Sequence, residues 1–172
     1  MKNGVMVEIG GRKWKVLDQT EKGFFCICEK IDVRKFDGES NNYANSEIRK
    51  YLNSEVLKEL EVAVGAENIV PFERDLASLC GLKEYGTCED KVSLISVDEY
   101  RKYREFLPRT EEWWWTLTPE STASNGVKYW TSVVSPSGYF YDFGDCGSSS
   151  GVRPFCIFSS SIFESGVVKE IE

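Results

Sequence analysis

Histidine is absent from all 172 residues of the sequence, and this absence removes several classes of enzyme. Ser-His-Asp and Cys-His nucleophile systems and most catalytic zinc sites need an imidazole as base or ligand. A cluster of basic residues is also missing, and the net charge is -7. Because nucleic-acid affinity rests on clustered lysine and arginine that release counterions, we expect no nucleic-acid partner.

Long hydrophobic runs are missing as well. No stretch reaches the roughly 18 apolar residues of a membrane span, and the opening residues, MKNGVMVEIGGRKWKV, contain no signal-peptide core. As written, the chain is predicted to be cytoplasmic and to have no membrane span, while a place on a phage particle or a displayed surface stays open.

Cysteine is present six times, but in spacings that match no zinc or redox signature. The cysteines lie at positions 26, 28, 80, 88, 146 and 156, so the first two have the spacing C-x-C and the next two the spacing C-x7-C. We therefore expect reduced, mostly buried thiols, with no metal and no cofactor.

Enough apolar residues are present for one substantial core, because 41% of the residues are hydrophobic. We expect a single domain over residues 1–172, with a helix-containing scaffold half at 1–110 and a variable, ligand-binding half at 111–163. The predicted fold is α+β, with antiparallel sheets, two main helices and a loop-rich C-terminal half. Short strands are expected at residues 5–8, 13–17, 24–29, 91–96, 113–117, 127–134, 139–143 and 152–158.

Both helices have recognisable ends in the sequence. The first is predicted in NSEIRKYLNSEVLKELEVAVG, residues 45–65, with Asn45 or Ser46 as cap, a glycine stop and an interruption near its Asn-Ser pair. The second is a short helix that opens at a capping box in residues 96–99 and continues through Tyr103. Residues 72–90 show no sustained periodicity of hydrophobic residues and are predicted to be a loop.

Residues 113–163 differ from the rest in composition, with twelve of the 23 aromatic residues but five of the 49 charged ones. Within them, residues 137–150 use only Ser, Gly, Tyr, Phe, Asp and Cys. Tyrosine offers rigid contact area at low entropy cost, while the small polar residues add adaptable hydrogen bonds, as in binding loops. In an extended segment Tyr139, Tyr141 and Phe143 project to one face. A flexible loop with its aromatics packed into the core is the alternative.

The six residue types of this run also share a feature of the genetic code. All of them are reached from the asparagine codon AAC by changes at its two adenines alone. This is the footprint that an adenine-targeted mutator would leave in the segment.

Residues 113–155, from WWWTLTPE to GVRPF, resemble the C-terminal half of a C-type-lectin-like domain. This type is shared by formylglycine-generating-enzyme-like proteins and by the variable proteins of diversity-generating retroelements. In that pattern a Trp-Trp-Leu-Arg-Ser-Pro-like strand leads through variable positions to a closing Gly-Val/Phe-Arg-Pro, and TLTP at 116–119 departs from it by lacking the arginine. GGRKWKVLD, NSEIRKYLN and VSLISVDEY also resemble an uncharacterised bacterial domain family with the same ending. The matching residues of the lectin-like pattern are Trp114, Trp115, Gly151, Val152, Arg153 and Pro154.

The resemblance implies a rigid scaffold under a variable face. The residues agree, since a guanidinium beside the fixed ring of a proline can bridge carbonyls of irregular backbone. Because adjacent strand residues alternate, Trp114 is expected to point opposite to its two tryptophan neighbours. The expected scaffold residues are Trp114, Trp115, Gly151, Arg153 and Pro154, and the expected ligand face is Tyr129, Trp130, Tyr139, Tyr141, Phe143, Asp145, Cys146, Ser148 and Ser149.

The function implied by the resemblance is binding of a protein or cell-surface ligand through a hypervariable surface, with no catalytic role. The formation of a homo-oligomer is compatible with this function. One alternative is a formylglycine-generating-enzyme-like oxidoreductase, which needs Cys146 and Cys156 reactive and close together. Another is a structural or assembly domain of a phage or cell-surface complex. Asp142 and Asp145 are interpreted as hydrogen-bond acceptors rather than as an acid–base pair.

Overall fold

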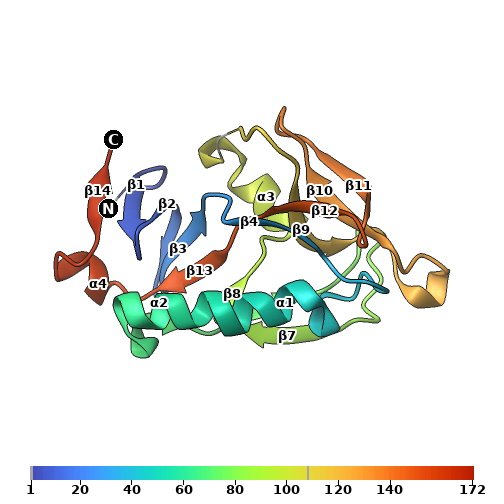
Figure 1. The fold of residues 1–172 in the computed structure, drawn as a ribbon, viewed down its shortest axis with the longest axis horizontal. Coiled ribbons are helices and arrows are strands. Elements are labelled where there is room, and N and C mark those ends of the chain that lie inside the picture. The colour runs from blue at the N-terminus through green and yellow to red at the C-terminus, as the bar shows by residue number, and fades with distance from the viewer. Residues whose placement is uncertain (1, 108) are drawn as a thin grey trace.

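Two β-sheets stand side by side in the computed structural model, which describes residues 2–107 and 109–172 (Figure 1). The larger sheet has the order β14-β1-β2-β3-β13-β5, and β8 also pairs with β13. It contains strands from both ends of the chain, because β1 pairs with β14. Its strands are β1 (Met6–Ile9), β2 (Arg12–Thr20), β3 (Gly23–Cys28), β5 (Ile69–Val70), β8 (Val92–Ser93), β13 (Phe155–Phe158) and β14 (Lys169–Ile171).

The smaller sheet has the order β11-β10-β9-β12-β4 and comes mainly from the C-terminal half. Its pairings are antiparallel except for β9 with β12. The strand predicted at 152–158 is two strands, one in each sheet, because Pro154 has no N–H for a ladder and the chain changes sheets there. The five strands are β4 (Asp32–Lys35), β9 (Trp114–Pro119), β10 (Trp130–Val134), β11 (Phe140–Asp145) and β12 (Ser149–Val152).

The first hairpin explains how the N-terminal meander forms. Ile9 pairs with Arg12, so a two-residue turn of Gly10 and Gly11 joins β1 to β2. Both glycines have positive φ, 61° and 72°, which such a turn requires and which side chains with a Cβ rarely adopt.

One continuous helix of 18 residues lies below both sheets in Figure 1. It consists of α1 (Glu47–Tyr51), a π-helical turn η2 (Leu52–Val56) and α2 (Leu57–Val64). The Ser46 side chain accepts a hydrogen bond from the Arg49 N–H at the start, and Gly65 ends the helix at φ 88°. The interruption predicted near Asn53 is the π-helical turn, where the Asn53 amide bonds to both backbone groups of Val92 in β8.

The second predicted helix is α3 (Val97–Lys102), which has the short length expected, but the prediction of two main helices is wrong because only the 18-residue helix is long. Its capping box between Ser96 and Glu99 is confirmed. After α3 the chain continues as a 3-10 turn rather than extending the helix. The remaining short helices are α4 (Ser161–Glu164), η1 (Tyr43–Asn45), η3 (Ala66–Asn68), η4 (Arg104–Phe106) and η5 (Ala123–Asn125).

The predicted loop at 72–90 contains a hairpin, β6 (Phe72–Asp75) with β7 (Thr87–Asp90). The strand was hidden in the sequence because Arg74, a charged residue, occupies a buried position. Its guanidinium donates to Ser93 Oγ at 2.9 Å and to both carboxylate oxygens of Glu99. This ion pair ties the hairpin to the start of α3.

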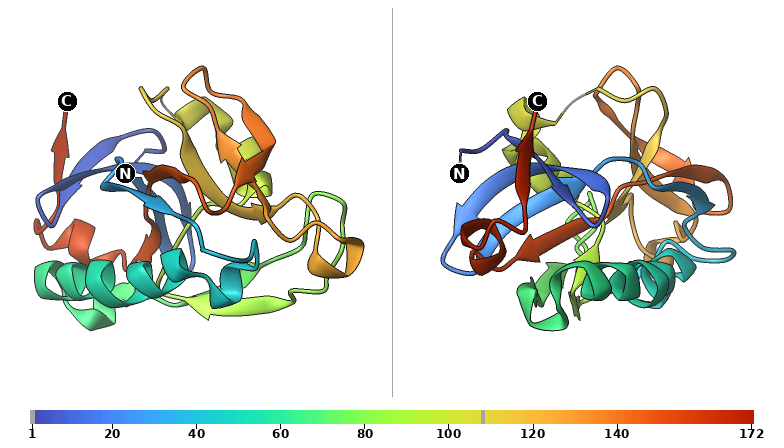
Figure 2. Two further views of the ribbon diagram at one scale, coloured as in Figure 1. Left: turned by 45° about the vertical axis from the view of Figure 1, so that its right-hand side comes forward. Right: turned by 60° about the vertical axis from the view of Figure 1, so that its left-hand side comes forward.

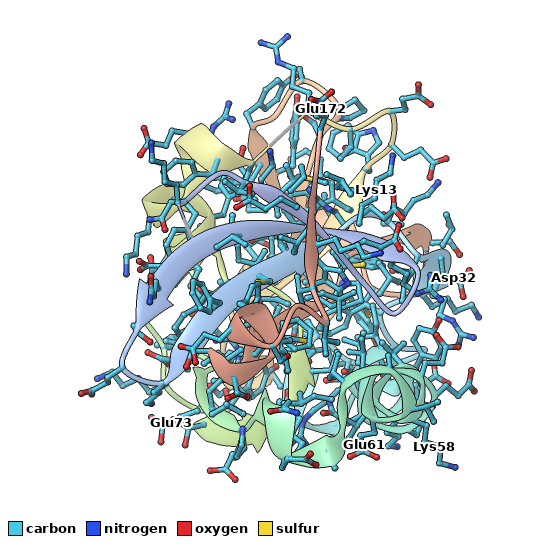
Figure 3. The ribbon with its side chains drawn as sticks, turned by 90° about the vertical axis from the view of Figure 1, so that its left-hand side faces the viewer. Lys13, Asp32, Lys58, Glu61, Glu73 and Glu172 are labelled. Atoms are coloured by element: carbon cyan, nitrogen blue, oxygen red, sulfur yellow. The ribbon has the colours of Figure 1, made fainter. Side chains whose placement is uncertain are left out.

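The larger part of the core lies between the long helix and the sheets, around Trp14, Ile48, Leu52 and Trp115. The two views of Figure 2 show the helix covering one side of the molecule while the edge of the smaller sheet stays uncovered. None of the helices in the described part of the chain has the length and apolarity that a membrane crossing needs. Figure 3 shows six labelled charged side chains on the outside of the molecule: Lys13, Asp32, Lys58, Glu61, Glu73 and Glu172.

Candidate ligand-binding surface

Four aromatic rings form a row on one face of β11, here called the aromatic row: Trp113, Tyr139, Tyr141 and Phe143. The Tyr141 ring is the centre, with centroid distances of 5.1 Å to Tyr139, 5.6 Å to Phe143 and 5.0 Å to Trp113. Alternation along the extended strand places 139, 141 and 143 on the same face, as the sequence predicts. The exposed fractions are 52% for Tyr139, 58% for Phe143 and 42% for Trp113, so the row faces solvent.

A cavity of about 420 Å³ opens beside the aromatic row. This volume lies within the range of small-molecule and side-chain pockets. Most of the lining side chains are apolar or aromatic. The polar groups among them are one carboxylate, three hydroxyls and two indole N–H groups. The described residues that line this aromatic cavity are Trp113, Trp115, Val133, Tyr141, Phe143, Gly144, Asp145, Ser148 and Ser150.

Gly144 makes room for the cavity. A Cβ at this position would lie 2.7 Å from Val133 Cγ1, 2.8 Å from the Thr131 carbonyl oxygen and 3.2 Å from the Trp115 ring. The pairing of β10 with β11 is irregular here, between Thr131 and Val133. The strand therefore approaches its neighbour too closely for any side chain at 144.

The polar groups of the surface are held by local hydrogen bonds. Asp145 Oδ1 accepts from the Gly147 N–H at 2.9 Å, which fixes the turn after β11. The Tyr141 hydroxyl donates to the Tyr139 hydroxyl oxygen at 3.1 Å. This bond raises the pKa of Tyr141, the donor, and lowers the pKa of Tyr139, whose oxygen accepts.

The predicted ligand-face residues divide into three groups. Tyr141, Phe143, Asp145 and Ser148 line the aromatic cavity, and Tyr139 extends the row beyond it. Three others are exposed but do not line the cavity: Tyr129, Trp130 and Ser149.

Cys146 does not belong to the surface, and its assignment to the ligand face is corrected. Its side chain is 1% exposed. The backbone N–H of Cys146 donates to the Tyr129 carbonyl, and its own carbonyl accepts from the N–H groups of Phe36 and Asp37. These bonds hold the residue between two segments and turn the thiol into the core.

Sequence reasoning missed five cavity residues, Trp113, Trp115, Val133, Gly144 and Ser150, of which Trp115 was expected in the scaffold alone. A signal for Trp113 was present in the tryptophan run, where residues two apart share a face. The structure places Trp113 and Trp115 on the cavity side, whereas Trp114 points away from them and packs against Arg153. Val133, Gly144 and Ser150 can be placed beside the cavity only when the pairing of strands β9, β10, β11 and β12 is known.

A family model for a domain of unknown function, DUF6273, matches residues 26–160, which is well over half of the chain. The chain belongs to the DUF6273 family. No curated protein and no solved structure matches it. The matched range includes the whole aromatic row and every residue that lines the aromatic cavity.

Arg153 has a scaffold position in this DUF6273 domain. Its side chain is 3% exposed, and its Nε donates to the Cys28 carbonyl at 2.9 Å. The guanidinium lies 4.7 Å from the centroid of the Trp114 ring, while its Nη1 has no hydrogen-bond partner among the described residues. Burial lowers the pKa of Arg153 to about 10. The guanidinium thus connects β3 to the underside of β9.

The backbone of Gly151 also supports the scaffold prediction for the DUF6273 domain. Its N–H donates to the Trp113 carbonyl at 2.7 Å, next to its pairing with Trp114. A Cβ there would lie 3.0 Å from that carbonyl oxygen. Pro154 is buried, and its carbonyl accepts from the Cys28 N–H at 2.8 Å.

The thiols of the DUF6273 domain are free, and four of the six are buried. Burial raises the pKa of Cys28 to about 12 and the pKa of Cys146 to about 11, and it raises the pKa of Cys156 as well. These shifts oppose the thiolate forms that thiol redox chemistry uses.

Carboxylates and thiols do not converge in the DUF6273 domain. Asp145 lines the cavity and Asp142 does not. Within residues 2–107 and 109–172, no three side chains of the metal-ligating types gather into a group that could hold a metal ion.

Proposed function

We propose that this DUF6273 domain is a ligand-binding protein whose aromatic row and aromatic cavity contact a protein or cell-surface ligand. The observation that carries the proposal is the solvent-facing row of Trp113, Tyr139, Tyr141 and Phe143 beside a cavity of about 420 Å³. Large aromatic anchors that can be desolvated, surrounded by small polar groups, are the usual source of binding energy at protein interfaces.

The surface combines rigid aromatic residues with small polar residues, as binding loops do. Rings with few rotatable bonds lose little entropy on contact, and Ser148, Asp145 and Ser149 offer adaptable hydrogen bonds at the rim. Buried Trp114, Trp115 and Arg153 stiffen the sheet behind them. An exposed aromatic patch of this kind on a folded domain marks an interaction site rather than a core fragment.

We further propose that the fold is C-type-lectin-like and that the chain is the variable protein of a diversity-generating retroelement. The resemblance over residues 113–155 supports this, and so does the six-type alphabet of residues 137–150. Hypervariation suits the exposed positions 139, 143, 145, 148 and 149 and the half-buried position 141. It does not suit the buried Cys146 or Gly144, which has no room for a side chain.

A catalytic role is not part of the proposal. The oxidoreductase alternative needs reactive thiols, and the raised pKa values of Cys146 and Cys156 oppose it. In the alternative of an assembly domain, the same surface would bind a second copy of the chain. Self-association at micromolar concentration in the absence of ligand would favour this alternative.

Selection of binding peptides from a random display library tests the ligand-binding proposal. We expect peptides that bind the wild type and lose at least tenfold in affinity on the double variant Tyr141→Ala/Phe143→Ala. Val62→Ala, which removes an exposed apolar side chain on α2, is the matched control and should leave affinity unchanged. Peptides that bind the double variant as well as the wild type would contradict the proposal.

The coding DNA tests the retroelement proposal separately. We expect a near-copy of the region encoding residues 115–158 in the flanking DNA, differing from the gene where the copy has adenine. The adenines should concentrate in codons of the exposed positions and be absent from codon 144. A copy whose differences fall on the buried codons would contradict this part of the proposal.

A further inference from the structure

We propose that the aromatic cavity binds an N-methylated or quaternary ammonium group of its ligand. The inference rests on the proposed function in that it uses the same surface, and it adds the chemistry of the group that enters the cavity. Four aromatic residues line the cavity: the partly or largely exposed Trp113, Tyr141 and Phe143 and the buried Trp115. Cations bind to the faces of such rings because the π system carries negative charge above and below the ring plane.

The orientation of the rings favours a cage over a flat stacking platform. The Tyr141 and Phe143 rings meet at 85° and the Trp113 and Tyr141 rings at 54°. Rings that are tilted toward one another surround a roughly spherical group better than a planar one. A trimethylammonium head is such a group, and it fits within about 420 Å³.

The charge around the cavity also favours a cation. Asp145 is the charged residue among the nine that line it, and no basic residue is among them. On the adjacent strand β4, Arg34 is already engaged: its Nε donates to Asp32 Oδ2 at 2.8 Å, and its guanidinium lies 3.6 Å from the centroid of the Tyr51 ring. A cation entering the cavity therefore meets a carboxylate without a competing basic partner in the lining.

The shortage of hydrogen-bond acceptors selects methylated over unmethylated ammonium. A primary ammonium is strongly hydrated and carries three N–H donors that need acceptors when water is removed. Among the lining side chains the hydrogen-bond acceptors are the Asp145 carboxylate and the hydroxyls of Tyr141, Ser148 and Ser150, and the others are apolar or indole rings. Methyl groups keep the positive charge and remove the donors, so they match the remaining walls.

Titration with choline, 3,3-dimethyl-1-butanol and ethanolamine tests the inference. The second probe has the same shape as choline without charge, and the third has the charge without the methyl groups. Binding is followed through the indole N–H resonances of the ¹⁵N-labelled protein at constant ionic strength. We expect choline to bind about tenfold tighter than either comparator, since cation–π contacts in a partly desolvated cage are of that size.

Two pairs of variants localise the effect. Asp145→Asn keeps the oxygen that accepts from Gly147 but removes the charge, and it should weaken choline about fivefold. Asp142→Asn, on the same strand but outside the cavity, should leave choline binding unchanged. Tyr141→Leu keeps apolar volume without a ring and should abolish the preference for choline over its neutral analogue, whereas Tyr129→Leu should preserve it.

Each result decides the inference. Equal affinities for choline and the neutral alcohol, or tighter binding of ethanolamine, would overturn it. No saturable shift by choline up to about 100 mM in a protein with an unchanged melting temperature would also overturn it. Peptide selection remains a separate readout, because peptides that depend on Tyr141 and Phe143 but contain no cationic group would keep the proposed function and reject the ammonium inference.

Discussion

Gly144 lies inside a run that looks freely variable in the sequence, yet its environment predicts that replacement even by alanine destabilises the fold. The added Cβ would lie 2.7 Å from Val133 Cγ1 and 2.8 Å from the Thr131 carbonyl oxygen, well inside van der Waals contact. The carbonyl belongs to a buried strand and cannot move cheaply. Overpacking of this kind costs about 1–3 kcal/mol of stability.

For a chain of this length the cost is readily measured. One kcal/mol shifts the melting temperature by about 2–4 °C, so Gly144→Ala should melt about 3–10 °C below the wild type in a circular-dichroism melt. Gly147→Ala is the matched control. Its Cβ would meet only Asp145 Oδ1, at 3.3 Å, and its melting temperature should stay within about 1–2 °C of the wild type. Equal melting temperatures for the two variants would refute the claim that β11 approaches β10 too closely for a side chain at position 144.

Three further predictions concern the scaffold. Asn53→Ala should lower the free energy of unfolding by about 1–3 kcal/mol in urea, because both backbone groups of Val92 lose their side-chain partner; a change below about 0.5 kcal/mol would contradict this. With a thiol reagent at pH 8, Cys80 should react first and the four buried thiols only after unfolding. Because folding raises the pKa of Cys28 from 9.0 to about 12, its contribution to stability is fully present below pH 9 and is lost as the pH rises toward 12. Rapid reaction of Cys146 and Cys156 in the native state would instead favour the oxidoreductase alternative. Arg153→Ala should be less stable than Arg153→Met by about 1–2 kcal/mol in the same urea assay, because both variants remove the buried charge and only methionine fills the volume. The reverse order would contradict a packing role for this side chain.

Local patterns were sufficient for the elements whose signals are local. The Gly10-Gly11 turn, the Ser46 cap and the capping box at Ser96 depend on residues a few positions apart, and all three are present in the structure. Alternation was likewise enough to place Tyr139, Tyr141 and Phe143 on one face. These features depend on backbone geometry that any extended or helical segment shares.

Long-range pairing explains what the sequence did not reveal. The hairpin of β6 and β7 has a buried Arg74 whose acid partner, Glu99, lies 25 residues away. Cys146 looked like one more exposed member of its run, but backbone bonds to Phe36, Asp37 and Tyr129 turn it inward. A residue-by-residue pattern has no information on such partners. The specific C-type-lectin-like topology is a proposal for the same reason.

The footprint of a selected peptide on the ¹H–¹⁵N spectrum tests the central claim most directly. The account predicts that the indole resonance of Trp113 and the amide resonances of residues 139–148 shift on binding, while those of the long helix at 47–64 do not. Shifts confined to the helix or to the larger sheet, with the Trp113 indole unchanged, would contradict the claim that the aromatic row is the ligand-binding surface.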